Sequence, residues 1–139
     1  MITFDIINLN HFNDIKKLLS QLTIIGDVKE KDFLTFIKNL PYNHMIYMIL
    51  YENNIAGMGT IIIENKIIHN FGKVCHIEDI VIDNKFRGLG LGKELINFLA
   101  MKGKSFGCYK IILDCNDKMV GFYNKCGFKR EGNMMTIRF

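Results

Sequence analysis

The chain has 139 residues and a formal net charge of +4, 49% of its residues are hydrophobic, and proline occurs once. This composition predicts one ordered domain over residues 1–139 and excludes a disordered or linker-like chain. No apolar run approaches the roughly 18 residues of a membrane helix. Because the first ten residues also lack a leader pattern, we expect a cytoplasmic protein.

Charge and cysteine patterns argue against two further classes. The 18 basic residues are scattered, which disfavours a nucleic-acid module, whereas a mild positive bias suits a small anionic ligand. The cysteines form no CxxC pair and have no histidine at zinc-like spacing. We therefore interpret Cys75, Cys108, Cys115 and Cys126 as reduced, mostly buried thiols and expect no metal.

The first half of the chain alternates between strand and helix patterns. Met1–Leu9 predicts a first strand. His11–Gln21 and Lys29–Leu40 place apolar residues three and four apart, which predicts two amphipathic helices. From His44 the pattern predicts a strand, a polar turn at Glu52–Asn54 and a second strand.

The second half continues this alternation. After the connection "KIIHNFGK", "VCHIEDIVI" predicts a third central strand, and a glycine turn opens a helix with Leu91, Leu95, Phe98 and Leu99 on one stripe. "CYKIILDC" predicts a short strand buried on both faces, and "NDKMVGFYNKC" a brief helix that ends at Gly127. The tail "FKREGNMMTIRF" predicts a last strand or hairpin. The order predicts an α/β (α+β) domain with a mixed central sheet flanked by helices.

The turn "RGLGLGKE" has the composition of a phosphate-binding loop. A Walker loop would need glycine in place of Arg87 and serine or threonine in place of Glu94. A dinucleotide fingerprint would put its third glycine at Lys93 or Leu95. The pattern that fits is Arg-x-x-Gly-x-Gly over Arg87–Gly92, whose backbone N–H groups could face an anion at the start of a helix.

Three acids stand among apolar strand residues. Glu78 and Asp79 would point to opposite faces of a regular strand, so a shared role requires a bulge between them. Surface ion pairs are the alternative. Asp114 ends another apolar strand, where isolated burial would be costly, and it either contacts a ligand or caps the following helix.

The glycine pattern after a central strand resembles the acetyl-CoA pyrophosphate loop of the GNAT acetyltransferase superfamily. The blocks "LSQLTIIGDV", "IIIENKIIH", "HIEDIVI", "CYKIILDC" and "VGFYNKCGF" resemble glucosamine 6-phosphate N-acetyltransferases, in the same order, from about Leu19 to Phe139. The resemblance implies direct transfer of an acetyl group from acetyl-CoA to the 2-amine of glucosamine 6-phosphate. This step would serve UDP-N-acetylglucosamine synthesis.

The resemblance also implies the roles of individual residues in catalysis and in binding acetyl-CoA. The N–H of Ile80, in a strand bulge, would polarise the thioester, and Tyr123 would protonate the leaving thiolate. Asp79 or Glu78 would orient the sugar and take the amine proton, directly or through water. The residues implied in binding acetyl-CoA are Ile80, Val81, Ile82, Arg87, Gly88, Leu89, Gly90, Leu91, Gly92, Lys93 and Tyr123.

For the sugar phosphate, the resemblance implies an acceptor site shared across a homodimer, to which the C-terminal strand contributes. The residues implied are Thr23, Lys66, Ile67, Ile68, His69, Glu78, Asp79, Tyr109, Lys110, Asp114 and Arg138. His11, His44 and His76 are interpreted as structural. Two alternatives stay open, namely acetylation of another small amine and a non-catalytic acyl-CoA-binding regulator.

Overall fold

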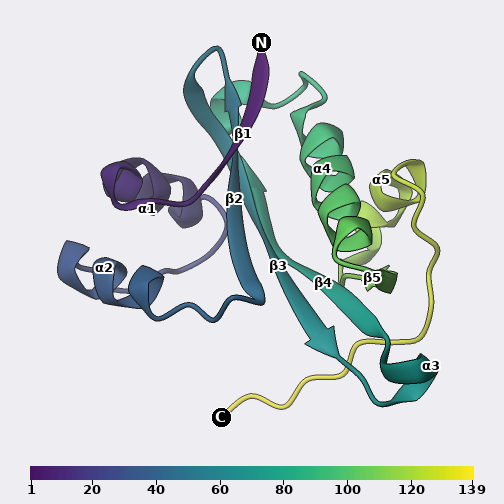
Figure 1. Ribbon diagram of the computed structural model, residues 1–139. Helices are drawn as coiled ribbons and strands as arrows, with labels where there is room; N and C mark the ends of the chain where they lie inside the picture. Colours follow the sequence, from purple (N-terminus) through teal and green to yellow (C-terminus); the bar gives the residue numbers. More distant parts are fainter.

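The structure, a computed structural model, describes residues 1–139. Its strands form one sheet in the order β1-β2-β3-β4-β5 (Figure 1). The first four run antiparallel, and β5 is parallel to β4, so the predicted mixed sheet is confirmed. The strands are β1 (Ile2–Ile6), β2 (His44–Tyr51), β3 (Asn54–Asn65), β4 (Lys73–Ile82) and β5 (Cys108–Ile112).

Helices lie on both sides of this sheet. In Figure 1, α1 and α2 lie on one side, and α4 and α5 lie on the other. No helix is long and apolar enough to cross a membrane. The helices are α1 (Phe12–Ser20), α2 (Glu30–Lys38), the short α3 (Ile68–Phe71), α4 (Leu91–Ser105) and α5 (Val120–Lys125), so each predicted helix is confirmed with slightly different ends.

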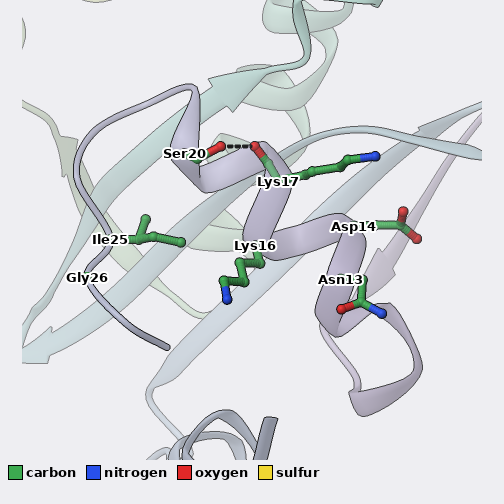
Figure 2. A pocket seen from close by; sticks show the side chains of 7 residues that line it. All are labelled: Asn13, Asp14, Lys16, Lys17, Ser20, Ile25 and Gly26. Atoms are coloured by element: carbon green, nitrogen blue, oxygen red, sulfur yellow. Dashed lines mark hydrogen bonds between the residues drawn. The ribbon is translucent and has the colours of Figure 1, made fainter. Parts of the chain in front are cut away.

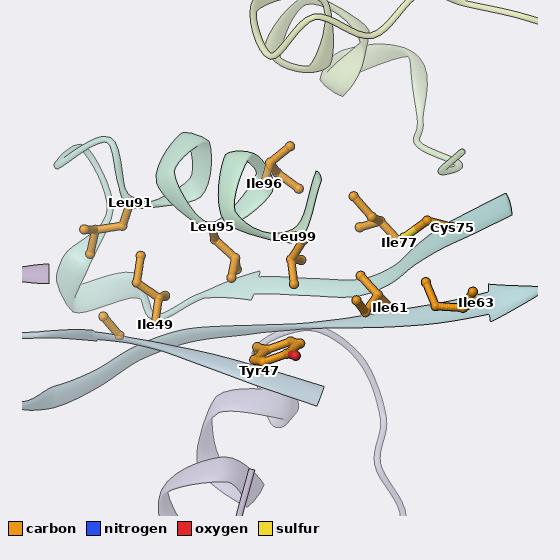
Figure 3. Close-up of a cluster of buried hydrophobic side chains, with 11 residues drawn as sticks. Tyr47, Ile49, Ile61, Ile63, Cys75, Ile77, Leu91, Leu95, Ile96 and Leu99 are labelled. Atoms are coloured by element: carbon orange, nitrogen blue, oxygen red, sulfur yellow. The ribbon is translucent and has the colours of Figure 1, made fainter. Parts of the chain in front are cut away.

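Two apolar clusters, one on each face of the sheet, form the core. Beneath α4, Leu91, Leu95 and Leu99 are buried against β2, β3 and β4 (Figure 3), which confirms the predicted stripe. Ile96 is also fully buried, whereas Phe98 is half-buried and stacks on Phe4 with ring centroids 4.1 Å apart. The cluster beneath α1 and α2 joins Ile15, Leu18 and Phe33 to β2, β3 and Val81.

Two predictions about the last third of the chain are wrong. β5 is not buried on both faces, because it is an edge strand and three of its five residues are exposed. The tail after Phe128 forms no strand, and residues 129–139 are all exposed. Figure 1 shows this tail leaving α5 and ending apart from the helices and strands, so it has no strand partner within the chain.

All four cysteines are free, but they differ in burial. Cys75 is fully buried, and desolvation raises the pKa of its thiol to about 12. Cys108, Cys115 and Cys126 are half-buried, so the expectation of mostly buried thiols holds fully only for Cys75.

The connection between β3 and β4 contains a left-handed turn. His69, Asn70 and Phe71 have φ angles of 54°, 57° and 58°. This conformation costs an L-residue roughly 1–2 kcal/mol, less for asparagine. We expect Asn70→Gly to raise the free energy of unfolding by about 0.5 kcal/mol, as measured by urea denaturation.

The matched control for this change is Asn39→Gly. Asn39 has φ −97°, which asparagine adopts without strain, so glycine relieves nothing there and only adds conformational entropy to the unfolded chain. We therefore expect this substitution to lower stability. Shifts of the same sign in both variants would contradict the interpretation that backbone strain is stored at Asn70.

Candidate active site

The two adjacent acids lie at a bulge in β4. The register with β3 jumps from Thr60 opposite Glu78 to Met58 opposite Val81. Asp79 and Ile80 therefore face the single residue Gly59, and Asp79 has φ 52°. The bulge that the resemblance implied is confirmed, and the side chains of Glu78 and Asp79 are both exposed.

Two glycines of β3 make room for this bulge. A Cβ on Gly59 would lie 2.5 Å from Cδ1 of Ile80, and a Cβ on Gly57 would lie 2.5 Å from Cδ1 of Ile82. The side chains of Ile80 and Ile82 therefore lie over β3 at Gly59 and Gly57, where β3 has no side chain. Neither glycine was predicted to have a role, although "GMG" inside a strand indicates a bulge or a close approach.

One edge of β4 is open along the bulge. β5 pairs with β4 only from Lys73 to His76, so Ile77–Ile82 has no neighbouring strand on that side. Asp114 is exposed and lies two residues beyond Ile112, the partner of His76. The two parallel strands thus leave unpaired backbone between them, where an extended ligand could form hydrogen bonds.

The glycine turn follows the open edge directly. Gly88 and Gly90 have φ 83° and 78°, and a Cβ on either would meet no other atom within 4 Å. Gly90 is the N-cap of α4 and provides no side-chain cap, so the first N–H groups of this helix remain available to an anion. Nε of Arg87 donates to the carbonyl oxygen of Ile82 at 3.3 Å, which ties the turn to β4.

Tyr123 in α5 lies between two aromatic rings. Its ring centroid is 5.0 Å from that of Phe122 and 6.0 Å from that of Phe128, both nearly perpendicular. Burial raises the pKa of the Tyr123 hydroxyl above its ordinary value, and the neighbouring thiols of Cys115 and Cys126 raise it further. The phenol is therefore protonated at neutral pH and is able to act as a donor.

A second group of predicted residues gathers around α3 and the start of β5. The ring of His69 lies against that of Tyr109 with centroids 4.3 Å apart, and Nζ of Lys110 is 5.9 Å from the Tyr109 ring. The backbone N–H of Lys66 donates to the carbonyl oxygen of Gly72 at 2.8 Å. Ile67 and Ile68 are exposed beside them.

These two groups are offset along β4. Asp79 lies six residues, about 20 Å, from Lys73 at the α3 end of the strand. The Lys66 side chain reaches part of this distance, because Glu64 connects it to His76, three residues or about 10 Å from Asp79. Arg138 lies in the exposed tail, outside both groups.

Thr23 lies in the loop after α1, on the side of the molecule that holds the bulge and the glycine turn. The nearby Gln21 accepts a hydrogen bond through Oε1 from the backbone N–H of Asn84 at 2.9 Å. This bond ties the loop after α1 to the segment just before the glycine turn. Gln21 was missed from sequence, because no local pattern indicates a contact across 63 positions.

An acid that the sequence analysis did not single out connects two basic side chains. Oε1 of Glu64 is 2.9 Å from Nε2 of His76, and Oε2 is 2.9 Å from Nζ of Lys66. The hydrogen bond from Lys66 lowers the pKa of Glu64 most, and the hydrogen bond with His76 lowers it further. His76, interpreted as structural, therefore shares a hydrogen-bond network with Lys66, a predicted phosphate ligand.

A hollow of substantial size lies elsewhere on the surface. It has a volume of about 550 Å³ and lies between α1 and the following loop (Figure 2). Its lining contains none of the predicted site residues, and it is open to solvent. The lining residues are Asn13, Asp14, Lys16, Lys17, Ser20, Ile25 and Gly26. The candidate active site is instead the wedge between β4 and β5.

Comparison with known proteins agrees with this geometry. Residues 12–128 match the model of the Acetyltransferase (GNAT) family. A glucosamine 6-phosphate N-acetyltransferase of Arabidopsis thaliana is 41% identical over 128 residues, 88% of this chain and 86% of that protein. Another, glucosamine 6-phosphate N-acetyltransferase 1 of Dictyostelium discoideum, is 41% identical over 86% of this chain and 78% of its own length.

The similarity extends to three dimensions. The crystal structure of glucosamine-6-phosphate N-acetyltransferase from Arabidopsis thaliana superposes with a TM-score of 0.94 and 36% identity, covering 100% of this chain and 99% of that one. Fold and site together define a GNAT acetyltransferase. Within that superfamily, the chain belongs to the glucosamine 6-phosphate N-acetyltransferases.

Proposed function

We propose that this protein acetylates the 2-amine of glucosamine 6-phosphate with acetyl-CoA and so supplies the synthesis of UDP-N-acetylglucosamine. The observation that carries the proposal is the bulge at Asp79 and Ile80, which lies on the open edge of β4 just before the glycine turn. The membership of the family, described above, identifies the sugar phosphate as acceptor.

The open edge and the turn fit acetyl-CoA as donor. The backbone of Ile80, Val81 and Ile82 would pair with the extended pantetheine arm, as a strand would. The glycine turn, Gly88–Gly92, which includes Leu89 and Leu91, would hold the pyrophosphate through N–H groups at the start of α4. Arg87 and Lys93 add positive charge there.

The bulge and the acids account for the chemistry at the carbonyl carbon. The amine nitrogen of the sugar forms a bond to this carbon while the carbon–sulfur bond breaks. The N–H of Ile80 would stabilise the oxygen that gains negative charge. Asp79 or Glu78, directly or through water, would take the proton that the amine loses. Asp114, at the mouth of the wedge, would orient the amine and the ring hydroxyls.

Tyr123 would complete the reaction by giving its proton to the departing thiolate. Its half-buried position and raised pKa support this role, because the phenol stays protonated and little water competes for the thiolate. After this step the carboxyl group, or its water, holds the proton lost by the amine, and Tyr123 is a phenolate. Transfer of a proton back to Tyr123 through solvent regenerates the site, and the products are free coenzyme A and N-acetylglucosamine 6-phosphate.

A homodimer would reconcile the two separated groups of residues. The partner's α3 region would bring Lys66, His69 and Lys110 to the sugar phosphate, with the tail adding Arg138. Exposed apolar side chains at Ile67, on α3 and in the tail support such an interface, since Ile67, Ile68, Phe71, Met135 and Ile137 are all largely exposed in one chain. The four free thiols fit a reducing compartment, the cytosol.

Thiol release from acetyl-CoA tests the acceptor. We expect rapid release with glucosamine 6-phosphate and at least about 100-fold lower kcat/KM with unphosphorylated glucosamine, because the phosphate forms charge-assisted hydrogen bonds that glucosamine cannot replace. Turnover with spermidine and not with the phosphosugar would contradict the proposed acceptor. Binding of acetyl-CoA with no release in any mixture would support the regulator interpretation instead.

A further inference from the structure

The helix that carries Tyr123 is too short to fix that side chain by itself. α5 has six residues and none of them is fully buried. An isolated helix of this length is unstable in water, so its position depends on side-chain contacts with the rest of the protein. One of these contacts joins Phe122, the residue before Tyr123, to the glycine turn.

Phe122 lies against the start of α4. A Cβ placed on Gly92 would be 3.3 Å from Cζ of Phe122, 3.6 Å from its Cε2 and 3.8 Å from Cγ1 of Ile82. The ring of Phe122 therefore occupies the space that the missing side chain of Gly92 leaves, close to the end of β4. Gly92 thus serves the packing of α5 as well as the turn.

The same ring contacts Tyr123 on its other side. The two rings meet nearly perpendicularly, at 76°, with centroids 5.0 Å apart. Phe128 contacts Tyr123 at 78°, and the N–H of Phe128 donates to the carbonyl oxygen of Tyr123 at 3.0 Å. Tyr123 is therefore held from two directions, and Phe122 connects it to Gly92 of the glycine turn.

From these contacts we infer that Phe122 is a positioning residue, which aligns the Tyr123 hydroxyl with the coenzyme A sulfur by anchoring α5 on Gly92. This inference deepens the proposed function, since it rests on Tyr123 as proton donor. A phenylalanine that merely filled space would affect stability and donor binding, whereas a positioning residue affects kcat through Tyr123.

A double-mutant cycle at Phe122 and Tyr123 tests the inference. We expect Phe122→Leu to lower kcat about tenfold, because small misplacements of a catalytic group are costly. KM for acetyl-CoA should change less than about twofold, since the turn and the open edge are untouched. Tyr123→Phe should lower kcat about 100-fold, and the double variant should be no slower than Tyr123→Phe alone.

Phe106→Leu is the matched control, because Phe106 is a partly exposed ring at the far end of α4 and should leave kcat unchanged. Thermal unfolding of each variant separates misfolding from misplacement. Phe122→Met, which keeps apolar volume next to Gly92, gives the same test if the leucine variant unfolds.

The possible results are distinguishable. If kcat falls about 1000-fold in the double variant, as independent effects would require, Phe122 acts by another route and the inference is overturned while the role of Tyr123 stands. If Tyr123→Phe alone retains the wild-type kcat, the proposed proton donor is wrong and the positioning role is overturned with it.

Discussion

Replacing Tyr123 with phenylalanine should lower kcat about 100-fold, the low end of what a positioned general acid contributes. The variant loses one hydroxyl and keeps the ring, so its contacts with Phe122 and Phe128 remain. We therefore expect KM for both substrates to stay within about threefold, because the hydroxyl acts mainly in the transition state. Steady-state thiol release at saturating substrates measures the effect.

The matched control is Tyr42→Phe, since Tyr42 is exposed in the loop before β2 and lies outside the site. A pH series adds a second check. Burial and the nearby thiols of Cys115 and Cys126 raise the pKa of Tyr123, so its ionisation should not reduce the wild-type kcat below about pH 10. A wild-type kcat in Tyr123→Phe would mean that water or another group protonates the thiolate.

The glycine turn could be predicted from sequence because its signal is local, since glycine at two of the three positions 88–90 indicates positive φ before a helix. The bulge was implied by the resemblance, because from the residues alone Glu78 and Asp79 could also lie on opposite faces of a regular strand and form surface ion pairs. Both features are present, at Asp79 and at Gly88 and Gly90. The local pattern did not indicate that Gly57 and Gly59, on the neighbouring strand, provide space for the side chains of Ile82 and Ile80.

Two contacts between residues far apart in the sequence could not be predicted, because no local pattern indicates them. The hydrogen bond from the N–H of Asn84 to Gln21 and the bridge from Glu64 to His76 join residues whose own neighbourhoods look ordinary. The tail was predicted as a strand because "MMTIRF" has strand-like residues. Strand propensity alone does not form a strand without pairing to a neighbouring edge, and the tail pairs with none of the free edges of this sheet.

The acceptor site of the proposed homodimer takes residues from both chains. We expect Arg138→Ala to reduce kcat/KM for glucosamine 6-phosphate about 30-fold, because a charge-assisted hydrogen bond contributes about 1.5–3 kcal/mol. KM for acetyl-CoA should not change. Arg130→Ala is the matched control, since Arg130 is exposed and pairs with Asp117 at the surface.

Mixing two impaired variants shows whether Arg138 acts in its own chain or in a partner. If each site takes Tyr123 from one subunit and Arg138 from the other, a mixed dimer of Tyr123→Phe and Arg138→Ala contains one doubly damaged site and one intact site. Co-refolding equal amounts yields about half mixed dimers, so about one quarter of the wild-type activity should return. If both residues serve the same chain, every site carries one lesion, and the mixture stays at the mean of its two parents. Recovery well above that mean therefore requires a shared site, and the exposure of the whole tail of one chain, with Arg138 outside both groups of predicted residues, is the reason to expect it.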